Sequence, residues 1–211
     1  MTRKERAEHI LDALKLEYPV VKCTLNYSNP LEMLIATQMS AQCTDARVNI
    51  ITAELFRKYK SVDDFADADF AELCEDIRSA GFYRSKAKNI ILTAQRIREV
   101  YGGEVPDTME DLLTLPGTGR KTANLVLGDV YKKPAIVVDT HSIRLTNRMG
   151  LTTNSDPTKI ENDLRKILPP EESLGFCHRM VYHGRAVCSA RKPNCESCVV
   201  RDLCRRKGVI L

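Results

Sequence analysis

The expected fold is decided by one stretch of the chain: Leu115-Pro116-Gly117-Thr118-Gly119-Arg120-Lys121-Thr122-Ala123. Its two glycines allow a tight hairpin, because glycine adopts backbone conformations that other residues avoid. A helix over residues 120–129 is predicted to follow, with its first N–H groups facing outward. Free N–H groups at the positive end of a helix dipole hold a phosphate without reading a base. The stretch therefore predicts an anion-binding hairpin.

A lysine and an aspartate near this hairpin are candidates for chemistry. Lys121 falls in the first turn of the predicted helix, where the dipole and any desolvation favour the neutral, nucleophilic amine. Asp139, in the stretch Val138-Asp139-Thr140-His141, can accept a proton or balance positive charge at a reacting centre. For an arbitrary pair, a solvated lysine and an aspartate that caps a helix are the commoner interpretation.

The composition is that of an ordinary globular protein. The chain has 211 residues, 43% of them hydrophobic and 28% charged, enough for one large core or two small ones. No apolar run reaches the length of a membrane span, and residues 1–6 lack the apolar core of a signal peptide. We therefore expect a cytoplasmic protein.

Eight cysteines divide into two groups. Four are scattered and are expected to be free thiols that pack like small hydrophobic side chains: Cys23, Cys43, Cys74 and Cys177. The others have the spacing C-x6-C-x2-C-x5-C: Cys188, Cys195, Cys198 and Cys204. In a cytoplasmic chain, so short a segment favours metal over disulfides. A zinc site and a [4Fe–4S] cluster both stay open at this point, because four thiolates hold either.

Positive charge collects towards the C-terminus. The net charge is only +4, but residues 177–211 contain eight Lys or Arg against two acidic residues. Arg191 and Lys192 lie in this segment, between the first two clustered cysteines. A basic segment is most often a solvated surface, yet it also supplies sequence-independent attraction to phosphates.

Apolar residues recur at helical spacing along most of the chain. A capping box, Thr2-Arg3-Lys4-Glu5, begins the first helix, Tyr18-Pro19 ends it, and Asn29-Pro30 begins the second. A long helix is predicted over residues 86–101, before Gly102-Gly103. Further buried candidates at helical spacing are Phe65, Phe70, Leu73 and Ile77.

Two later features do not alter the all-α prediction. The β-branched run Ile136-Val137-Val138 is too isolated to found a sheet. His178 and His183 are five residues apart, so they do not share a helix face, and structural roles are favoured over metal ligation.

Taken together, the motifs resemble the endonuclease III family of DNA glycosylases. That family carries Leu-Pro-Gly-x-Gly-x-Lys-Thr-Ala in a helix-hairpin-helix and a later Val-Asp-Thr-His. The other matching segments are Leu34-Ile35-Ala36, Ser40-Ala41-Gln42, Gly81-Phe82-Tyr83-x-Ser85-Lys86-Ala87 and the C-terminal cysteines. The resemblance covers nearly the whole chain. Thr118 departs from it, since relatives more often place an apolar residue of similar volume there.

The resemblance implies two helical domains with a DNA-binding cleft between them. Residues 23–133 would form a central domain with the helix-hairpin-helix, and residues 1–22 plus 134–211 a discontinuous domain with a [4Fe–4S] cluster. The cysteine spacing is that of the family's iron–sulfur members, which makes Cys188, Cys195, Cys198 and Cys204 the ligands. The expected partner is double-stranded DNA containing damaged bases or abasic sites, bound by a monomer that associates with the nucleoid.

The resemblance also implies residue roles. Lys121 would attack the sugar carbon C1′ of an oxidised pyrimidine, and Asp139 would be the catalytic carboxylate. Gln42 would enter the base stack and Phe82 would wedge against the opposite strand, although a surface amide and a core side chain are the simpler interpretations. The remaining DNA contacts are Gly117, Gly119, Arg191 and Lys192.

Three alternative functions explain fewer of these residues. A monofunctional adenine or mismatch glycosylase of the same superfamily shares the cysteine spacing but lacks a lysine at position 121. A non-catalytic helix-hairpin-helix module leaves Lys121 and Asp139 without a role. A nucleotide-binding loop lacks the glycine before Lys121 and the preceding strand.

Overall fold

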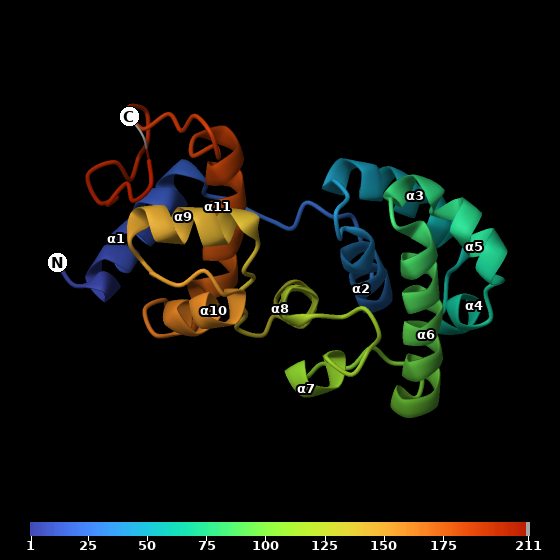
Figure 1. The fold of residues 1–211 in the computed structure, drawn as a ribbon. Coiled ribbons are helices and arrows are strands. Elements are labelled where there is room, and N and C mark those ends of the chain that lie inside the picture. Colours follow the sequence, from blue (N-terminus) through green and yellow to red (C-terminus); the bar gives the residue numbers. More distant parts are fainter. Residues whose placement is uncertain (210–211) are drawn as a thin grey trace. The chain divides into compact units, whose positions relative to one another are not determined.

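The computed structural model describes residues 1–209, and every regular element in that range is a helix (Figure 1). The all-α prediction is therefore confirmed. The chain divides into two compact units, Cys23–Lys132 and Met1–Lys22 with Lys133–Leu211. Each unit is described by itself below.

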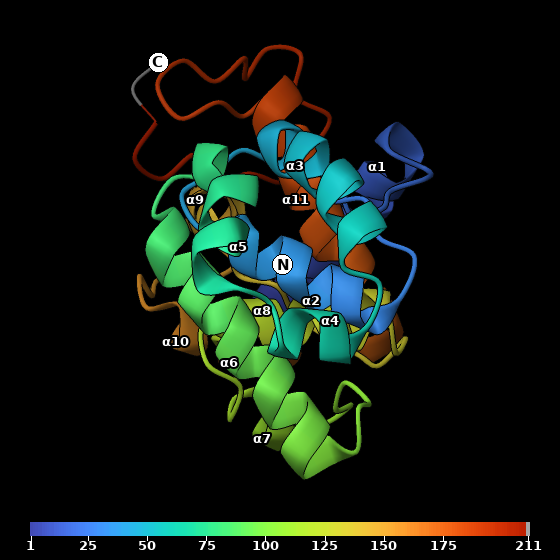
Figure 2. The ribbon, with the colours of Figure 1, turned by 90° about the vertical axis from the view of Figure 1, so that its right-hand side faces the viewer.

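The unit Cys23–Lys132 is built around two buried helices. Its elements are α2 (Pro30–Met39), α3 (Asp45–Lys58), α4 (Val62–Ala66), α5 (Phe70–Asp76), the 3₁₀ turn η1 (Arg78–Ala80), α6 (Tyr83–Tyr101), α7 (Met109–Leu112) and α8 (Arg120–Asp129). Helix α2 packs against α3, α6 and α8, whereas α4 and α5 pack along α6, as Figure 2 shows. Almost all of α2 and α8 is buried.

The second unit joins the N-terminal helix to the C-terminal third of the chain. Its elements are α1 (Arg3–Glu17), α9 (Thr140–Met149), α10 (Pro157–Arg165), the 3₁₀ turn η2 (Pro170–Glu172) and α11 (Ser173–Ala186). Helix α11 packs against both α1 and α9. After α11 the described chain continues to residue 209 as turns and loops, which carry the four clustered cysteines.

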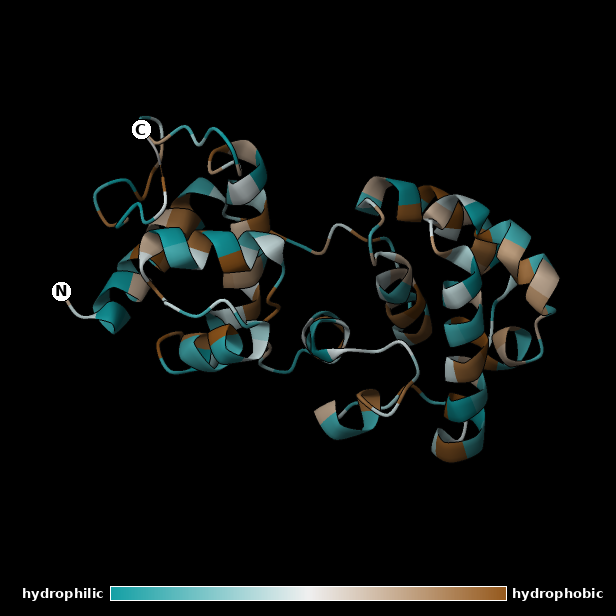
Figure 3. Ribbon diagram, viewed as in Figure 1, coloured by the Kyte–Doolittle hydropathy of each residue, from teal (hydrophilic) through white to brown (hydrophobic). Residues whose placement is uncertain are grey.

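Helix boundaries follow the predicted capping signals. Thr2 forms a capping box with Glu5, and Asn29 caps α2 with Pro30 at its first position. Helix α6 begins at Tyr83 rather than at residue 86. Figure 3 shows hydrophobic and hydrophilic segments alternating along α6, whose buried residues include Ala87, Ile90, Ala94 and Ile97. The amphipathic pattern thus places one face of α6 in the core.

Phe70 is predicted to be buried, but the structure leaves it partly exposed. Phe65, Leu73 and Ile77 are fully buried, but Phe70 is 47% exposed. It is the first residue of α5, directly after the capping residue Asp69. A helix terminus follows the cap geometry rather than the apolar face, so Phe70 points partly to solvent. Residues 136–138 are buried without forming a strand.

Within the described residues, no helix combines the length and apolar character needed to cross a lipid bilayer.

Candidate functional site

The predicted hairpin lies between α7 and α8. Gly117 has a φ of +72°, a left-handed conformation that glycine adopts without strain. The Thr118 backbone N–H donates to the Leu115 carbonyl oxygen at 3.1 Å, which closes the turn. Gly119 is the N-cap of α8, and this helix has the predicted bounds, Arg120–Asp129.

A buried amide fixes this hairpin to the core. Gln38, at 6% exposure, directs Nε2 to the Pro116 carbonyl oxygen at 3.0 Å and to the Thr118 hydroxyl at 3.1 Å. The Thr93 hydroxyl donates to the same Pro116 oxygen at 2.8 Å. The turn is therefore bonded to both α2 and α6. Sequence reasoning missed Gln38, although it stands just before the matching segment Ser40-Ala41-Gln42.

Replacing Gly117 by alanine is expected to destabilise the protein by about 2–3 kcal/mol, combining left-handed strain with overpacking. A Cβ at this position would lie 2.8 Å from Asn89 Nδ2 and 3.0 Å from Asn89 Cβ. Gly102→Ala is the matched control, because Gly102 is left-handed with a φ of +61° but a Cβ there meets nothing within 4 Å. Urea unfolding measures both variants, and equal losses of stability would refute the role of the Asn89 contact.

Lys121 lies at the exposed start of α8. No side chain caps this helix, since its N-cap is Gly119. Lys121 is exposed in the first turn, where the backbone N–H groups point along the helix axis. An uncapped N-terminus beside an exposed amine can bind an anion and present a nucleophile to it.

Three predicted DNA contacts line one pocket of the same unit. Gln42 and Phe82 border it together with Gly117, and the other lining residues are Gln38, Ala41, Ser85, Lys86 and Asn89. Gln42 and Phe82 have φ values of 54° and 48°, a conformation that costs of order 1–3 kcal/mol for a residue other than glycine. Strain of this kind concentrates at functional sites.

Phe82 is presented to solvent by the turn before α6. Its side chain is 67% exposed, so the interpretation as a core residue is wrong. Lys86 is buried and its Nζ donates to the Ala80 carbonyl oxygen at 2.7 Å, which holds the turn; burial lowers the pKa of Lys86. Phe82 is also the N-cap of α6, which has no side-chain cap. A second uncapped helix N-terminus therefore borders the pocket.

Asp139 is the N-cap of α9 in the other unit. Its Oδ1 accepts from the Ser142 backbone N–H at 2.7 Å, and the residue is only half-buried. The Ser142 hydroxyl donates to the Val137 carbonyl oxygen at 3.0 Å, which anchors the preceding segment. The capping role considered from the sequence is real. The capping bond fixes the orientation of the carboxylate. It uses only one of the two oxygens, so the other can still accept a proton from a reacting group.

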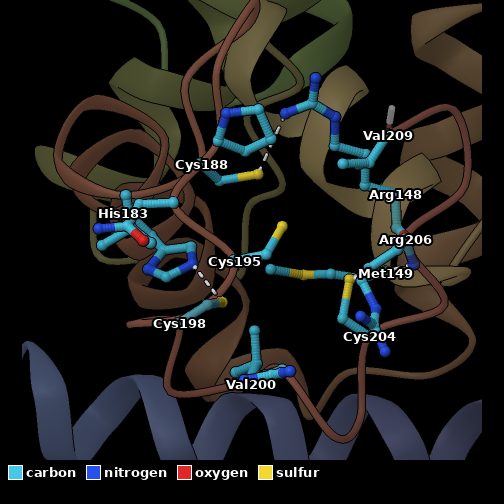
Figure 4. A pocket seen from close by; sticks show the side chains of 14 residues that line it. Arg148, Met149, His183, Cys188, Cys195, Cys198, Val200, Cys204, Arg206 and Val209 are labelled. Carbon is cyan, nitrogen blue, oxygen red and sulfur yellow. Dashed lines mark hydrogen bonds between the residues drawn. The ribbon is translucent and has the colours of Figure 1, made fainter. Parts of the chain in front are cut away.

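The four clustered cysteines face a common pocket after α11, as Figure 4 shows. Three of the sulfur atoms have a hydrogen-bond partner. Arg148 Nη1 donates to Cys188 Sγ at 3.3 Å, and the Arg206 backbone N–H donates to Cys204 Sγ at 3.4 Å. His183 Nε2 lies 3.4 Å from Cys198 Sγ. Donors around ligating sulfurs are the usual outer shell of a metal–thiolate site.

The donor set of this pocket suits an iron–sulfur cluster. Four cysteine thiols line it, and four thiolates are the ligands that a [4Fe–4S] cluster takes, one for each iron.

Two arginines outside the set of predicted site residues bind the cysteine loop to α9. Arg144 Nη2 donates to the Cys188 carbonyl oxygen at 3.0 Å, and Arg148 donates to the carbonyl oxygens of Ser189 and Ala190, each at 2.7 Å. The helix that carries Asp139 at its start is thus bonded to the loop that follows Cys188. Arg191 and Lys192 lie exposed on that loop.

Known proteins share both the hairpin and the cysteine segment. Residues 35–170 match the model of the HhH-GPD superfamily of base excision DNA repair proteins, and residues 188–204 match the iron–sulfur binding domain of endonuclease III. Endonuclease III of Synechocystis sp. is 48% identical over 204 residues, which are 96% of this chain and 93% of the relative.

Solved structures agree with the sequence matches. A trapped endonuclease III–DNA covalent intermediate, described as an estranged-adenine complex, has a TM-score of 0.93 and 42% identity, with 98% of this chain and 97% of that chain covered. A non-covalent endonuclease III–DNA complex gives the same values. The hairpin, the cysteine segment and full-length similarity lead to one conclusion: the chain belongs to the endonuclease III family of HhH-GPD base excision DNA repair proteins.

Proposed function

We propose that this enzyme removes oxidised pyrimidines from duplex DNA through attack by Lys121, and that it acts as a monomer on nucleoid DNA in the cytoplasm. Its family membership makes it a bifunctional DNA glycosylase and AP lyase of base excision repair, with a [4Fe–4S] cofactor. The observation that carries the residue assignment is the exposed amine of Lys121 in the uncapped first turn of α8, directly after the hairpin.

The reaction requires the damaged nucleotide outside the base stack, because C1′ is inaccessible in an intact duplex. The neutral Nζ of Lys121 forms a bond to C1′, and the bond from C1′ to the base breaks, with the base taking the electron pair and a proton. Nζ then loses its two protons, one to the departing base and one to O4′ as the C1′–O4′ bond breaks with its electron pair on O4′, and this gives an imine that solvent protonates. The C2′ proton is then acidic, so its removal expels the 3′ phosphate by β-elimination.

Asp139 has two roles in the proposal. Its carboxylate stabilises positive charge that develops on the sugar as the base leaves, and it accepts the proton that the reacting amine must lose. The capping bond from Ser142 holds the carboxylate in one orientation. We propose that Cys23–Lys132 and the second unit act as the two domains of the enzyme, with Lys121 in one domain and Asp139 in the other.

In this proposal, backbone N–H groups contribute more of the contacts to DNA phosphates than charged side chains do. Gly117 and Gly119 leave N–H groups open to a phosphate at the start of α8, and the uncapped start of α6 offers a second such position. Both Gln42 and Phe82 are strained and exposed, and in the proposal Gln42 fills the gap left by the extruded nucleotide while Phe82 wedges against the opposite strand. Arg191 and Lys192 add sequence-independent attraction to the DNA backbone.

The cluster would be held by Cys188, Cys195, Cys198 and Cys204. When bound, it supplies a one-electron redox centre. Its bonds to the four cysteine sulfurs also stabilise a loop that has no regular helix. The chain's own contribution there is to hold that loop through Arg144 and Arg148. The cysteines thereby support the basic residues Arg191 and Lys192 against the DNA.

Two alternatives are less well supported. A monofunctional adenine or mismatch glycosylase does not use an amine nucleophile, so the placement of Lys121 has no purpose in it. A non-catalytic helix-hairpin-helix module explains the uncapped α8 but not the oriented carboxylate of Asp139.

Borohydride trapping on a duplex with an abasic site tests the proposal. Reduction of the imine is expected to give a covalent protein–DNA adduct, and mass spectrometry of the digested adduct is expected to place the modification on Lys121. An active protein that binds the duplex yet forms no adduct would exclude the lyase mechanism. An adduct on another lysine would overturn the residue assignment alone.

A further inference from the structure

A tyrosine and a histidine outside the DNA-binding surfaces form a hydrogen-bonded chain that ends on a cysteine sulfur. The Tyr18 hydroxyl lies 3.2 Å from His183 Nδ1. His183 Nε2 in turn lies 3.4 Å from Cys198 Sγ, the contact drawn as a dashed line in Figure 4. The imidazole is only 1% exposed. The three side chains come from the end of α1, from α11 and from the cysteine loop.

The chemistry of the groups fixes the direction of this chain. A cysteine sulfur that ligates iron has lost its proton, so it can only accept a hydrogen bond. A neutral imidazole has one donor and one acceptor nitrogen. His183 must then carry its proton on Nε2, facing Cys198, and Nδ1 must accept from the Tyr18 hydroxyl. Both hydrogen bonds therefore point towards the sulfur.

Tyr18 is held rigidly by its own backbone. Its N–H donates to the Leu14 carbonyl oxygen at 2.8 Å, and its carbonyl oxygen accepts from Arg179 Nε at 3.1 Å. Its ring packs edge-on against both Tyr182 and His183. The hydroxyl is thus aimed at Nδ1 by packing on α11, and this selects the tautomer of the imidazole.

We propose that Tyr18 and His183 are positioning residues that raise the reduction potential of the cluster through a hydrogen bond to the sulfur of Cys198. This inference rests on the proposed assignment of Cys198 as a ligand. Reduction adds negative charge that spreads onto the ligating sulfurs, so a donor at a sulfur stabilises the reduced state more than the oxidised state. Arg148 and Arg206 supply further donors to Cys188 and Cys204.

The Tyr18→Phe variant isolates this effect, because it removes only the hydroxyl and leaves every ligand in place. Without the hydroxyl that polarises the ring at Nδ1, the His183 Nε2–H is a weaker donor to the sulfur of Cys198. The one-electron equilibrium constant for reduction is expected to fall about tenfold, a potential shift of roughly −59 mV. Film voltammetry at constant pH measures the shift, and analysis of iron and sulfide confirms that the cluster is loaded.

Tyr182→Phe is the matched control, since Tyr182 touches the Tyr18 ring but is not part of the chain to Cys198. It is expected to leave the potential unchanged. An equal shift in both variants would assign the effect to packing, and an unchanged potential in loaded Tyr18→Phe would overturn the proposal.

A second pair of variants decides the question if Tyr18→Phe loses the cluster. His183→Gln retains an N–H donor towards Cys198, whereas His183→Leu retains none. The glutamine variant is expected to retain iron and to keep a reduction potential near that of the wild type. In the leucine variant, the reduction potential is expected to drop at least as far as in Tyr18→Phe, or the protein is expected to lose iron faster. Equal behaviour of the two would refute the hydrogen bond as the cause. Borohydride trapping tests the nucleophile Lys121, so its outcome does not depend on these variants. A wild-type protein that contained no iron and sulfide would overturn the assignment of the cysteines as cluster ligands.

Discussion

Replacing Lys121 by glutamine is expected to abolish strand cleavage at abasic sites and the borohydride-trapped adduct, a loss of at least about 10³-fold in the single-turnover rate. Glutamine has a similar length and keeps hydrogen-bonding capacity, but its amide nitrogen is not nucleophilic. Because the backbone N–H groups of α8 are unchanged, duplex binding is expected to stay within a few-fold. Cleavage of a labelled abasic duplex and a binding titration on the same preparation measure the two effects.

Lys159→Gln is the matched control for this substitution. Lys159 is also an exposed lysine in the first turn of a helix, but Asp156 caps that helix, α10. It is expected to keep full activity. If Lys121→Gln bound DNA normally and still cleaved at the wild-type rate, another nucleophile would have to be sought.

Local signals in the sequence were enough to predict the hairpin and the helix that follows it. Pro116, Gly117 and Gly119 constrain the backbone within a few residues, and α8 has the predicted bounds. Phe70 shows the limit of the same reasoning, because apolar spacing does not reveal where a cap ends a buried face. Helix termini are set by capping bonds as well as by periodicity.

The residues that hold the site in place could not be predicted from the sequence, because their hydrogen-bond partners lie far away along the chain. Gln38 holds a hairpin about eighty residues away, and Arg148 holds a loop about forty residues away. His183 was interpreted as structural because no second histidine shared its helix face, yet its partners Tyr18 and Cys198 come from distant segments. Local sequence patterns do not reveal such partners, because the hydrogen-bonding groups meet only once the chain has folded.

The strained conformations of Gln42 and Phe82 could not be predicted from the residues either. Neither residue type favours a positive φ, so the surrounding turns impose it. The resemblance to a family indicated these two positions, but their exposure and strain are structural facts that give the DNA-binding proposal a physical basis.

Asp139→Asn separates the structural and chemical roles of this carboxylate. Asparagine caps helices as well as aspartate does, so the free energy of unfolding is expected to change by only a few tenths of a kcal/mol. The charge and the proton acceptor are lost, which is expected to slow base removal and strand cleavage by about 10²–10⁴-fold. Urea unfolding and single-turnover cleavage of a duplex with one oxidised pyrimidine measure the two quantities.

Two further variants complete the test of Asp139. Asp139→Ala removes the capping bond to Ser142 as well, so it is expected to lose about 1 kcal/mol of stability while slowing the reaction as much as the asparagine variant does. Asp156→Asn changes another N-cap of the same unit, and it is expected to affect neither stability nor rate. Full activity in Asp139→Asn together with a loss in Asp139→Ala would mean that Asp139 acts through the start of α9, and the proton acceptor would then have to be another group.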